Sequence, residues 1–209
     1  MLKDPSPFKD NRFLQLLVAW MLLVWVLSAI KPFSRPEWVI ENFLVVGYAM
    51  VLTLTYRQFK FTNLAYGLFG VFWTLHLIGA HYTYAETPVG FWMQDLLGGT
   101  RNNYDRLVHF SYGLLCAYAM WDILIRAARV RLSWSYFLAV TAILAFSSFY
   151  ELLEAIVAGV LTPELGRMWI GAQGDVWDAH KDTLLAFLGS IIAMLITWTS
   201  VRLQRVRHS

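Results

Sequence analysis

Six apolar stretches, each close to 20 residues long, constrain the fold of this chain more than any other feature. The hydrocarbon core of a bilayer takes about 20 consecutive apolar residues of a helix. Charged residues fill only 15% of the 209 positions, whereas soluble domains carry about 25%. The sequence therefore predicts an integral membrane protein and excludes a soluble domain. The expected spans cover about 13–30, 38–56, 63–81, 107–126, 134–160 and 182–201.

These spans are expected to be helices. None of the stretches alternates polar and apolar residues, as the strands of a membrane barrel do, and helices bond their backbone groups internally. Four prolines fall between the stretches, where helix breakers belong: Pro32, Pro36, Pro88 and Pro163. The first stretch lacks a small-residue cleavage site, so we expect an uncleaved span. We predict an all-α, polytopic membrane helix bundle of six transmembrane helices, with residues 1–209 in one domain.

The basic residues predict the orientation, because cytoplasmic loops carry an excess of Lys and Arg. Eleven basic residues fall on the side of the N-terminus: Lys3, Lys9, Arg12, Arg57, Lys60, Arg126, Arg129, Arg131, Arg202, Arg205 and Arg207. Six fall on the other side: Lys31, Arg35, Arg101, Arg106, Arg167 and Lys181. Both termini are therefore predicted to be cytoplasmic. The basic residues form no stripe, so no nucleic-acid partner is expected.

Acidic and histidine residues gather on the predicted outer side. Asp4, Asp10 and Asp122 lie inside, and Asp122 is expected to pair with Arg126 one turn later. The other eleven of the 14 acidic residues lie on or near the outer side. So do four of the five histidines: His76, His81, His109 and His180. Acidic residues contribute little to topology. Either the outer loops are simply well solvated, or these residues assemble a site.

Two pairs within the spans are candidate site residues. Glu151 and Glu154 interrupt an apolar helix about 25 Å from its start, on one face. Ionisable groups placed so deep usually face the bundle and mark function, although a structural pair bonded to neighbouring helices is the alternative. Asp105 and His109 are four residues apart and can bind a metal together, or the Asp can orient the His for proton transfer. Alternatively, Asp105 caps its helix and His109 is an interfacial polar residue.

Further candidates flank these pairs. Asp175, Asp178 and Asp182 follow an i, i+3, i+7 pattern on one helical face, although the helix dipole alone would favour one Asp there. Carboxylates suit Mg²⁺ or Ca²⁺, and carboxylates with His also suit Zn²⁺ or Mn²⁺. His76 is predicted to point inward as a site residue, with a hydrogen-bonded core histidine as the alternative. His81 lies about 140° further round the helix, so on a regular helix it would not point at the same centre as His76. Whether His81 belongs to the site stays open.

The connection over 82–106 is long for a compact bundle, and such loops are often lids or binding loops, although some are plain linkers. Its stretch from Phe91 to Leu97 is expected to form a short amphipathic helix along the outer interface. The turn residues Gly98, Gly99, Asn102 and Asn103 are expected to make it a movable cover.

Four stretches resemble the YjdF family of bacterial inner-membrane proteins: His76–Tyr84 (HLIGAHYTY), Tyr104–Phe110 (YDRLVHF), Tyr150–Glu154 (YELLE) and Gly174–Asp182 (GDVWDAHKD). The resemblance covers nearly the whole chain and implies a multi-pass protein of the bacterial inner (cytoplasmic) membrane. A fainter likeness is to VanZ-like membrane proteins, whose Asp-Lys-x-x-His-Phe motif is matched by Asp105, His109 and Phe110, with Arg106 in place of the Lys. Their later Glu and Asp would correspond to Glu151 and Asp178.

The leading functional hypothesis is a membrane-embedded, metal-assisted hydrolase that acts on a lipid or envelope molecule at the outer face. The expected ligands of a divalent metal (Zn, Mn or Mg) are His76, Asp105, His109, Glu151, Glu154, Asp175, Asp178 and Asp182. The first five of these are also the candidate catalytic residues. Two alternatives remain. The protein could be an ion-coupled transporter in which Glu151, Glu154 and His76 titrate along a pathway, or an accessory protein whose polar cluster ties helices together.

Overall fold

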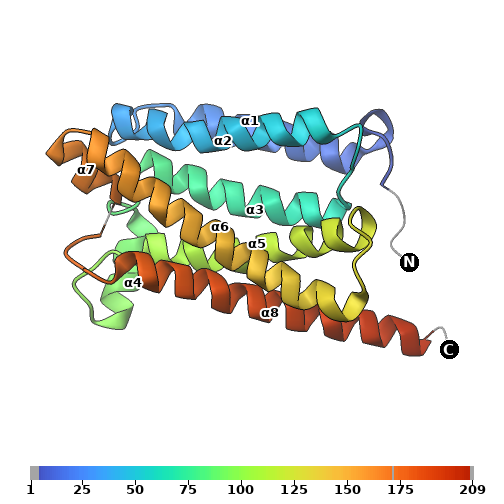
Figure 1. Cartoon of the computed structure of the whole chain (residues 1–209). Helices are drawn as coiled ribbons and strands as arrows, with labels where there is room; N and C mark the ends of the chain where they lie inside the picture. Colours follow the sequence, from blue (N-terminus) through green and yellow to red (C-terminus); the bar gives the residue numbers. More distant parts are fainter. Residues whose placement is uncertain (1–4, 171, 208–209) are drawn as a thin grey trace.

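The computed structural model describes residues 5–170 and 172–207, and these form helices without a strand. Six long helices run along one axis: α1 (Arg12–Ser28), α2 (Arg35–Thr55), α3 (Asn63–His81), α5 (Tyr104–Arg126), α6 (Leu132–Val160) and α8 (Asp178–Arg207) (Figure 1). Three short elements lie at their ends: the 3₁₀ turn η1 (Phe8–Asp10), α4 (Pro88–Leu97) and α7 (Pro163–Ile170). The predicted all-helical bundle is confirmed.

Each predicted apolar stretch is a helix, and five of these helices are long and apolar enough to cross a membrane: α2, α3, α5, α6 and α8. The sixth, α1, has 17 residues and is shorter than the others. Five spans are therefore supported, while six spans and the cytoplasmic termini stay predictions. The predicted bounds of α3 are those observed. Helix α8 extends beyond 182–201 at both ends, because polar and charged residues flanking the apolar run continue the helix from Asp178 to Arg207.

Three of the four prolines expected between the helices stand at helix starts, and the first of them, Pro36, is in the first turn of α2. Pro88 stands in the first turn of α4, and Pro163 is the first residue of α7. A proline fits this position because its fixed φ is already helical and its missing N–H would have no partner inside the helix. The short helix predicted over 91–97 is therefore present and begins three residues earlier. Helix α7 was missed, because Pro163 was interpreted only as a breaker.

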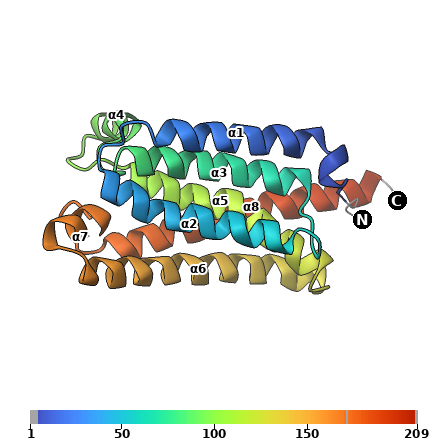
Figure 2. The same ribbon diagram turned by 90° about the horizontal axis from the view of Figure 1, so that it is seen from above.

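The centre of the bundle is the crossing of α5 and α8 (Figure 2). Gly113 and Gly189 face each other there: a Cβ on Gly113 would collide with the carbonyl of Ala186, and one on Gly189 with the carbonyl of Phe110. Small side chains continue this contact, since Ala117, Ala186 and Ser190 are fully buried. Close approach through small residues is the usual way in which membrane helices associate. It fixes the position of α8 relative to α5.

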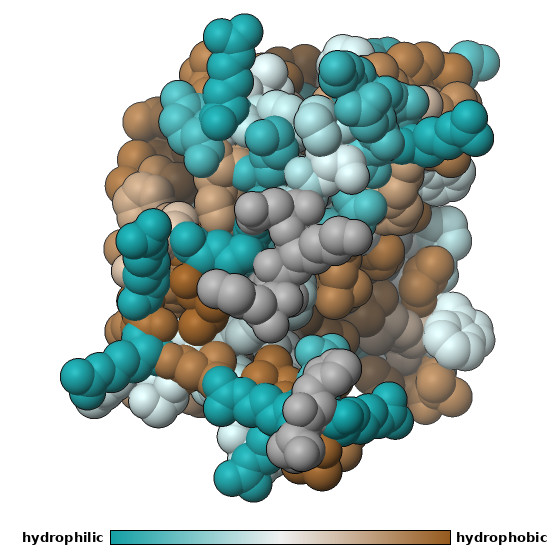
Figure 3. All heavy atoms as spheres, turned by 90° about the vertical axis from the view of Figure 1, so that its right-hand side faces the viewer, coloured by the Kyte–Doolittle hydropathy of each residue, from teal (hydrophilic) through white to brown (hydrophobic). Residues whose placement is uncertain are grey.

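The two ends of the bundle differ in charge. At the end where α1 begins and α8 ends, called here the basic end, hydrophilic side chains project around the rim (Figure 3). At the opposite end, called here the site end, α2, α5 and α8 begin and α3 and α6 end. Because α1 begins and α8 ends at the basic end, the arrangement agrees with two termini on one side of the membrane.

A buried ion pair joins three segments at the basic end. Arg126 Nε lies 2.6 Å from Asp122 Oδ1, as the sequence predicted. Asp122 is fully buried and also accepts a hydrogen bond of 3.0 Å from the backbone N–H of Thr62, which precedes α3. Arg126 donates to the carbonyl of Lys60 and lies over the ring of Phe59. The pair therefore ties the α2–α3 connection to the end of α5.

Replacing Asp122 by alanine is expected to lower the free energy of unfolding by about 3 kcal/mol, because it removes a fully buried carboxylate from the half-buried guanidinium of Arg126. Unfolding of the detergent-solubilised protein by sodium dodecyl sulfate, followed by circular dichroism, would measure the change. Asp10→Ala is the matched control, since Asp10 is an exposed acid at the same end. Equal stability of the two variants would contradict the structural role of the pair.

Candidate functional site

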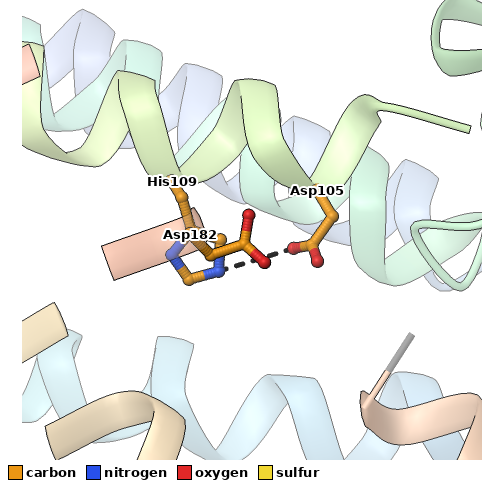
Figure 4. Close-up of side chains that lie close together, drawn as sticks. All are labelled: Asp105, His109 and Asp182. Atoms are coloured by element: carbon orange, nitrogen blue, oxygen red, sulfur yellow. Dashed lines mark ion pairs between the residues drawn. The ribbon is translucent and has the colours of Figure 1, made fainter. Parts of the chain in front are cut away.

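Asp105, His109 and Asp182 converge at the site end (Figure 4). Each offers one ligand atom, and these atoms all lie within 4.8 Å of one another. Nε2 of His109 is 3.5 Å from Oδ1 of Asp105. His109 and Asp182 are buried, and Asp105 is half-buried. Three of the predicted ligand residues, from two helices far apart in sequence, therefore form one compact cluster.

Local sequence explains how the cluster is built. Asp105 and His109 lie one turn apart in the first turns of α5, and Asp182 lies one turn into α8. The glycine contact between α5 and α8 follows directly after these turns, since Gly113 is four residues beyond His109. The start of α5 is held by Asn102, whose Oδ1 accepts the N–H of Tyr104 at 3.1 Å. The crossing that packs the helices thus also brings the three side chains together.

Glu151 extends the cluster from a third helix, α6. Its Oε1 lies 3.5 Å from Nε2 of His109. Glu154 follows one turn later, is half-buried, and lines the cavity described below. Both glutamates thus face the bundle interior, as their sequence pattern predicted.

The distances within the cluster suit a metal ion better than direct hydrogen bonds. Both contacts of His109 Nε2 are 3.5 Å, longer than the ~2.7–3.2 Å of good hydrogen bonds. Two ligands about 2.1 Å from a tetrahedral zinc ion are separated by about 3.4 Å. In addition, Oδ1 of Asp182 and Oε1 of Glu151 are buried without a hydrogen-bond partner among the described residues. Buried oxygens of this kind normally have one, so the donor set fits a cation.

The other two predicted aspartates are occupied by basic side chains. Arg101 Nη2 lies 2.7 Å from Oδ1 of Asp178. Asp175 is 2.5 Å from both Arg106 Nη2 and Lys181 Nζ. The hydrogen bond from Lys181 lowers the pKa of Asp175 to about 2, with further contributions from the N–H of Trp177 and the charge of Arg106. Asp175 and Asp178 therefore lie beside the cluster, where they hold Arg101, which precedes α5, and Arg106, in its first turn.

Arg101 also reaches the cluster itself, because its Nη2 lies 3.6 Å from Oδ2 of Asp105. Asp105 thus has one oxygen toward Arg101 and the other toward His109. Partners of this kind fix the orientation of a ligand and tune its affinity.

His76 belongs to a neighbouring group of buried polar residues. Its Nδ1 is 2.6 Å from the hydroxyl of Tyr84, and its Nε2 is 3.7 Å from Oε2 of Glu41. Burial raises the pKa of the Tyr84 phenol well above its ordinary value, so the hydroxyl stays protonated and can donate to His76. Nε2 of His76 and Oε2 of Glu41 have no hydrogen-bond partner among the described residues. His81 turns elsewhere, with its Nδ1 2.9 Å from the carbonyl of Ser28.

The connection before α5 is anchored where we predicted a movable cover. Asn102 is 1% exposed. Its amide donates to the carbonyl of Thr87, and its backbone exchanges two hydrogen bonds with the side chain of Gln173. The predicted movable cover is therefore wrong for this part of the loop. The side chain of Asn102 bonds to backbone groups of Thr87 and Tyr104, and so it holds the loop in place.

A cavity of about 700 Å³ leads from these polar groups along the inside of the bundle. Its polar end is formed by Glu37, Glu41, His76, Tyr84, Asp105, His109, Tyr150 and Glu154. The remaining wall is mostly apolar and comes from α2, α3, α5, α6 and α7. The cavity therefore connects the metal-suited cluster and the His76 group, which the sequence could only place at the same end.

Several site residues were missed or undervalued from the sequence. Arg101 and Arg106 were counted only as loop charges, although their nearness to Asp105 was a usable signal. Glu37 and Glu41 are at most 2% exposed and line the cavity, although no pattern in the sequence singled them out. Tyr84 carried no sequence signal, because its role depends on a loop that turns back onto Gly79.

Comparison with known proteins agrees with this architecture. Residues 13–203 match the family described as predicted membrane protein (DUF2238). The inner membrane protein YjdF of Escherichia coli (strain K12) is 34% identical over 179 residues, which cover 84% of each chain. No solved structure matches. The chain therefore belongs to the DUF2238 family and is a multi-pass protein of the bacterial inner membrane.

Proposed function

We propose that this protein is a membrane-embedded, metal-assisted hydrolase that acts on a lipid or envelope molecule at the outer face of the inner membrane. The observation that carries the proposal is the convergence of Asp105, His109 and Asp182 within 4.8 Å, with Glu151 beside them. Three protein ligands with one position left open are typical of catalytic metal sites. One imidazole and two carboxylates favour Zn²⁺ or Mn²⁺ over Mg²⁺, which prefers oxygen ligands alone.

Each residue has a distinct role in this proposal. Asp105, His109 and Asp182 hold the ion, and Arg101 orients Asp105. A divalent ion bound there would polarise the scissile ester and make a water molecule more acidic. Glu151 accepts the proton of the attacking water and returns it to the leaving oxygen as the ester bond breaks. Six spans with cytoplasmic termini complete the proposal and would place the site end outside.

The cavity argues against the ion-coupled transporter. Beyond its polar end, no charged residue of the described chain lines the wall, which reaches Thr55 and Ala127 near the basic end. An ion would lack partners along this path, and unpaired charges in an apolar interior are costly. An apolar substrate, in contrast, would find a matching surface.

Metal binding by the purified full-length protein tests the proposal. After treatment with a chelator, titration with Zn²⁺ and Mn²⁺ by calorimetry is expected to show one saturable site per chain. Glu151→Gln is expected to retain the ion and to slow hydrolysis by about 10²–10⁴-fold. Release of water-soluble products or fatty acid from vesicles of inner-membrane lipid, followed by mass spectrometry, would measure hydrolysis. A chain that stays folded and binds neither ion would rule out the proposal.

A further inference from the structure

The cavity opens sideways between α2 and α6. Helix α2 packs against α3 and α7, but among the described residues no Cα of α2 lies within 8 Å of a Cα of α6. Figure 1 shows that the two helices diverge from the site end toward the basic end. Both contribute to the cavity wall, and rim residues such as Phe43, Val51 and Phe146 are exposed. In a bilayer this opening faces the hydrocarbon chains of the surrounding lipid.

The size of the cavity fits one lipid chain. It runs beside α2 from Glu37 to Thr55, which is roughly 27 Å at the helical rise of 1.5 Å per residue. A water molecule takes ~30 Å³ in the liquid. If a methylene takes the same volume, the cavity of about 700 Å³ would hold about 23 carbons. That is room for one fatty acyl chain and not for two. The second chain of a phospholipid would stay in the bilayer, outside the opening.

The charge at the polar end selects the headgroup. Four acidic residues line it, Glu37, Glu41, Asp105 and Glu154, and no Lys or Arg of the described chain lines the cavity. Glu37 and Glu41 are at most 2% exposed, and each has an oxygen without a hydrogen-bond partner. The rings of Trp73 and Tyr84 line the same end. Carboxylates and aromatic faces together attract an ammonium group.

We propose that this cavity binds phosphatidylethanolamine, with one acyl chain inserted between α2 and α6 and the ammonium group beside Glu37 and Glu41. The two residues that face the ammonium group are not proposed metal ligands, although Asp105 and His109 line the same cavity. The proposal rests on the proposed function only in identifying the bound lipid as the substrate.

Gly47 of α2 offers a way to close the cavity. It lines the wall, and a Cβ placed there would meet nothing within 4 Å. Gly47→Trp should therefore fill the cavity without strain in the bundle. Gly159→Trp is the matched control, because Gly159 is also a helical glycine with open space around it, is exposed, and does not line the cavity. Val51→Trp, at the exposed rim, is a second closing variant in case Gly47→Trp fails to fold.

Photo-crosslinking tests the proposal. The full-length protein is reconstituted in vesicles that contain phosphatidylethanolamine with a diazirine in the middle of one acyl chain. Labelled residues are mapped by mass spectrometry and normalised to Leu195, which faces outward on α8. Labelling of Cys116 is expected because this side chain lies on the cavity wall. It is only 5% exposed, so a lipid chain outside the cavity would not reach it. Gly47→Trp should reduce the labelling by at least about five-fold, since a Trp side chain is large enough to fill the chain's place, and Gly159→Trp should not change it.

The headgroup is tested with diazirine-labelled phosphatidylglycerol and with the double variant Glu37→Gln/Glu41→Gln. In the wild-type protein, the phosphatidylethanolamine probe is expected to label Cys116 more strongly than the phosphatidylglycerol probe does. In the double variant, the two probes should label Cys116 equally. Equal labelling from both lipids, or no labelling of Cys116, would overturn the proposal. Asp182→Ala, which removes a proposed metal ligand that does not line the cavity, should leave the labelling intact. Failure of the lipid site and failure of the metal site are therefore distinguishable.

Discussion

His109→Ala is expected to lower the affinity of the purified protein for Zn²⁺ by at least about 100-fold. Removing a partner that only orients a ligand costs about 10–100-fold in metal affinity, and His109 would be the ligand itself. Its Nε2 lies 3.5 Å from a carboxylate oxygen of both Asp105 and Glu151. Calorimetric titration of the chelator-treated protein would measure the change, with Mn²⁺ as a second ion.

His180→Ala is the matched control for this loss. His180 lies in the first turn of α8, is exposed, and packs its ring against Trp177 away from the cluster. Its replacement should leave the affinity unchanged. Added imidazole is expected to restore part of the binding to folded His109→Ala, because it can occupy the vacated volume. Unchanged zinc affinity in His109→Ala would contradict the assignment of the metal centre.

Gly113→Leu is expected to prevent formation of the native bundle. The first atom of the new side chain would occupy the position of the Ala186 carbonyl, so α5 and α8 would have to separate along their length. The cost should exceed the ~1–3 kcal/mol typical of an overpacked core, because the clash is with backbone rather than with a movable side chain. Size-exclusion chromatography and unfolding in sodium dodecyl sulfate would show the loss of folded protein.

The milder Gly113→Ala variant tests whether this crossing also positions the site. Even a methyl group there has to displace α8, which carries Asp182. Metal sites need their ligands held within about 0.5 Å of the working geometry. Zinc affinity is therefore expected to fall although every ligand is intact. Gly159→Leu should affect neither folding nor affinity, since a Cβ there would meet nothing within 4 Å. Wild-type affinity in folded Gly113→Ala would show that the crossing does not control the site.

The sequence predicts the helices well because the bilayer imposes a simple length rule on apolar runs. It also predicts the pairing of Asp105 with His109 and of Asp122 with Arg126, since residues four apart in a helix are neighbours in any fold. Contacts between helices are different. Whether Asp182 or Asp178 reaches His109 depends on the crossing of α5 and α8, which Gly113 and Gly189 determine.

The same distinction explains the residues whose places could not be predicted. The predicted acidic stripe is only partly on a helix, because α8 begins at Asp178 and Asp175 precedes it. Arg101 and Arg106 occupy the carboxylates of these two residues. That division follows from the path of a loop held by Asn102 and Gln173. The cavity was equally inaccessible to sequence reasoning, because it arises where α2 and α6 fail to touch, and a missing contact leaves no periodic pattern.

The shortness of α1 has a consequence for the membrane around the protein. Seventeen residues span about 25 Å, less than the ~30 Å of a typical hydrocarbon core. Helix α1 packs along α3 and touches α2 near its end, where Trp25 donates to Asn42. Its outer face is apolar and exposed, including Leu16, Leu22 and Leu23. The bilayer beside a short helix becomes thinner to match the length of the helix. If α1 spans the bilayer as predicted, the membrane is expected to be thinner along this flank than beside the 29-residue α6, so the protein would stand in a bilayer of uneven thickness.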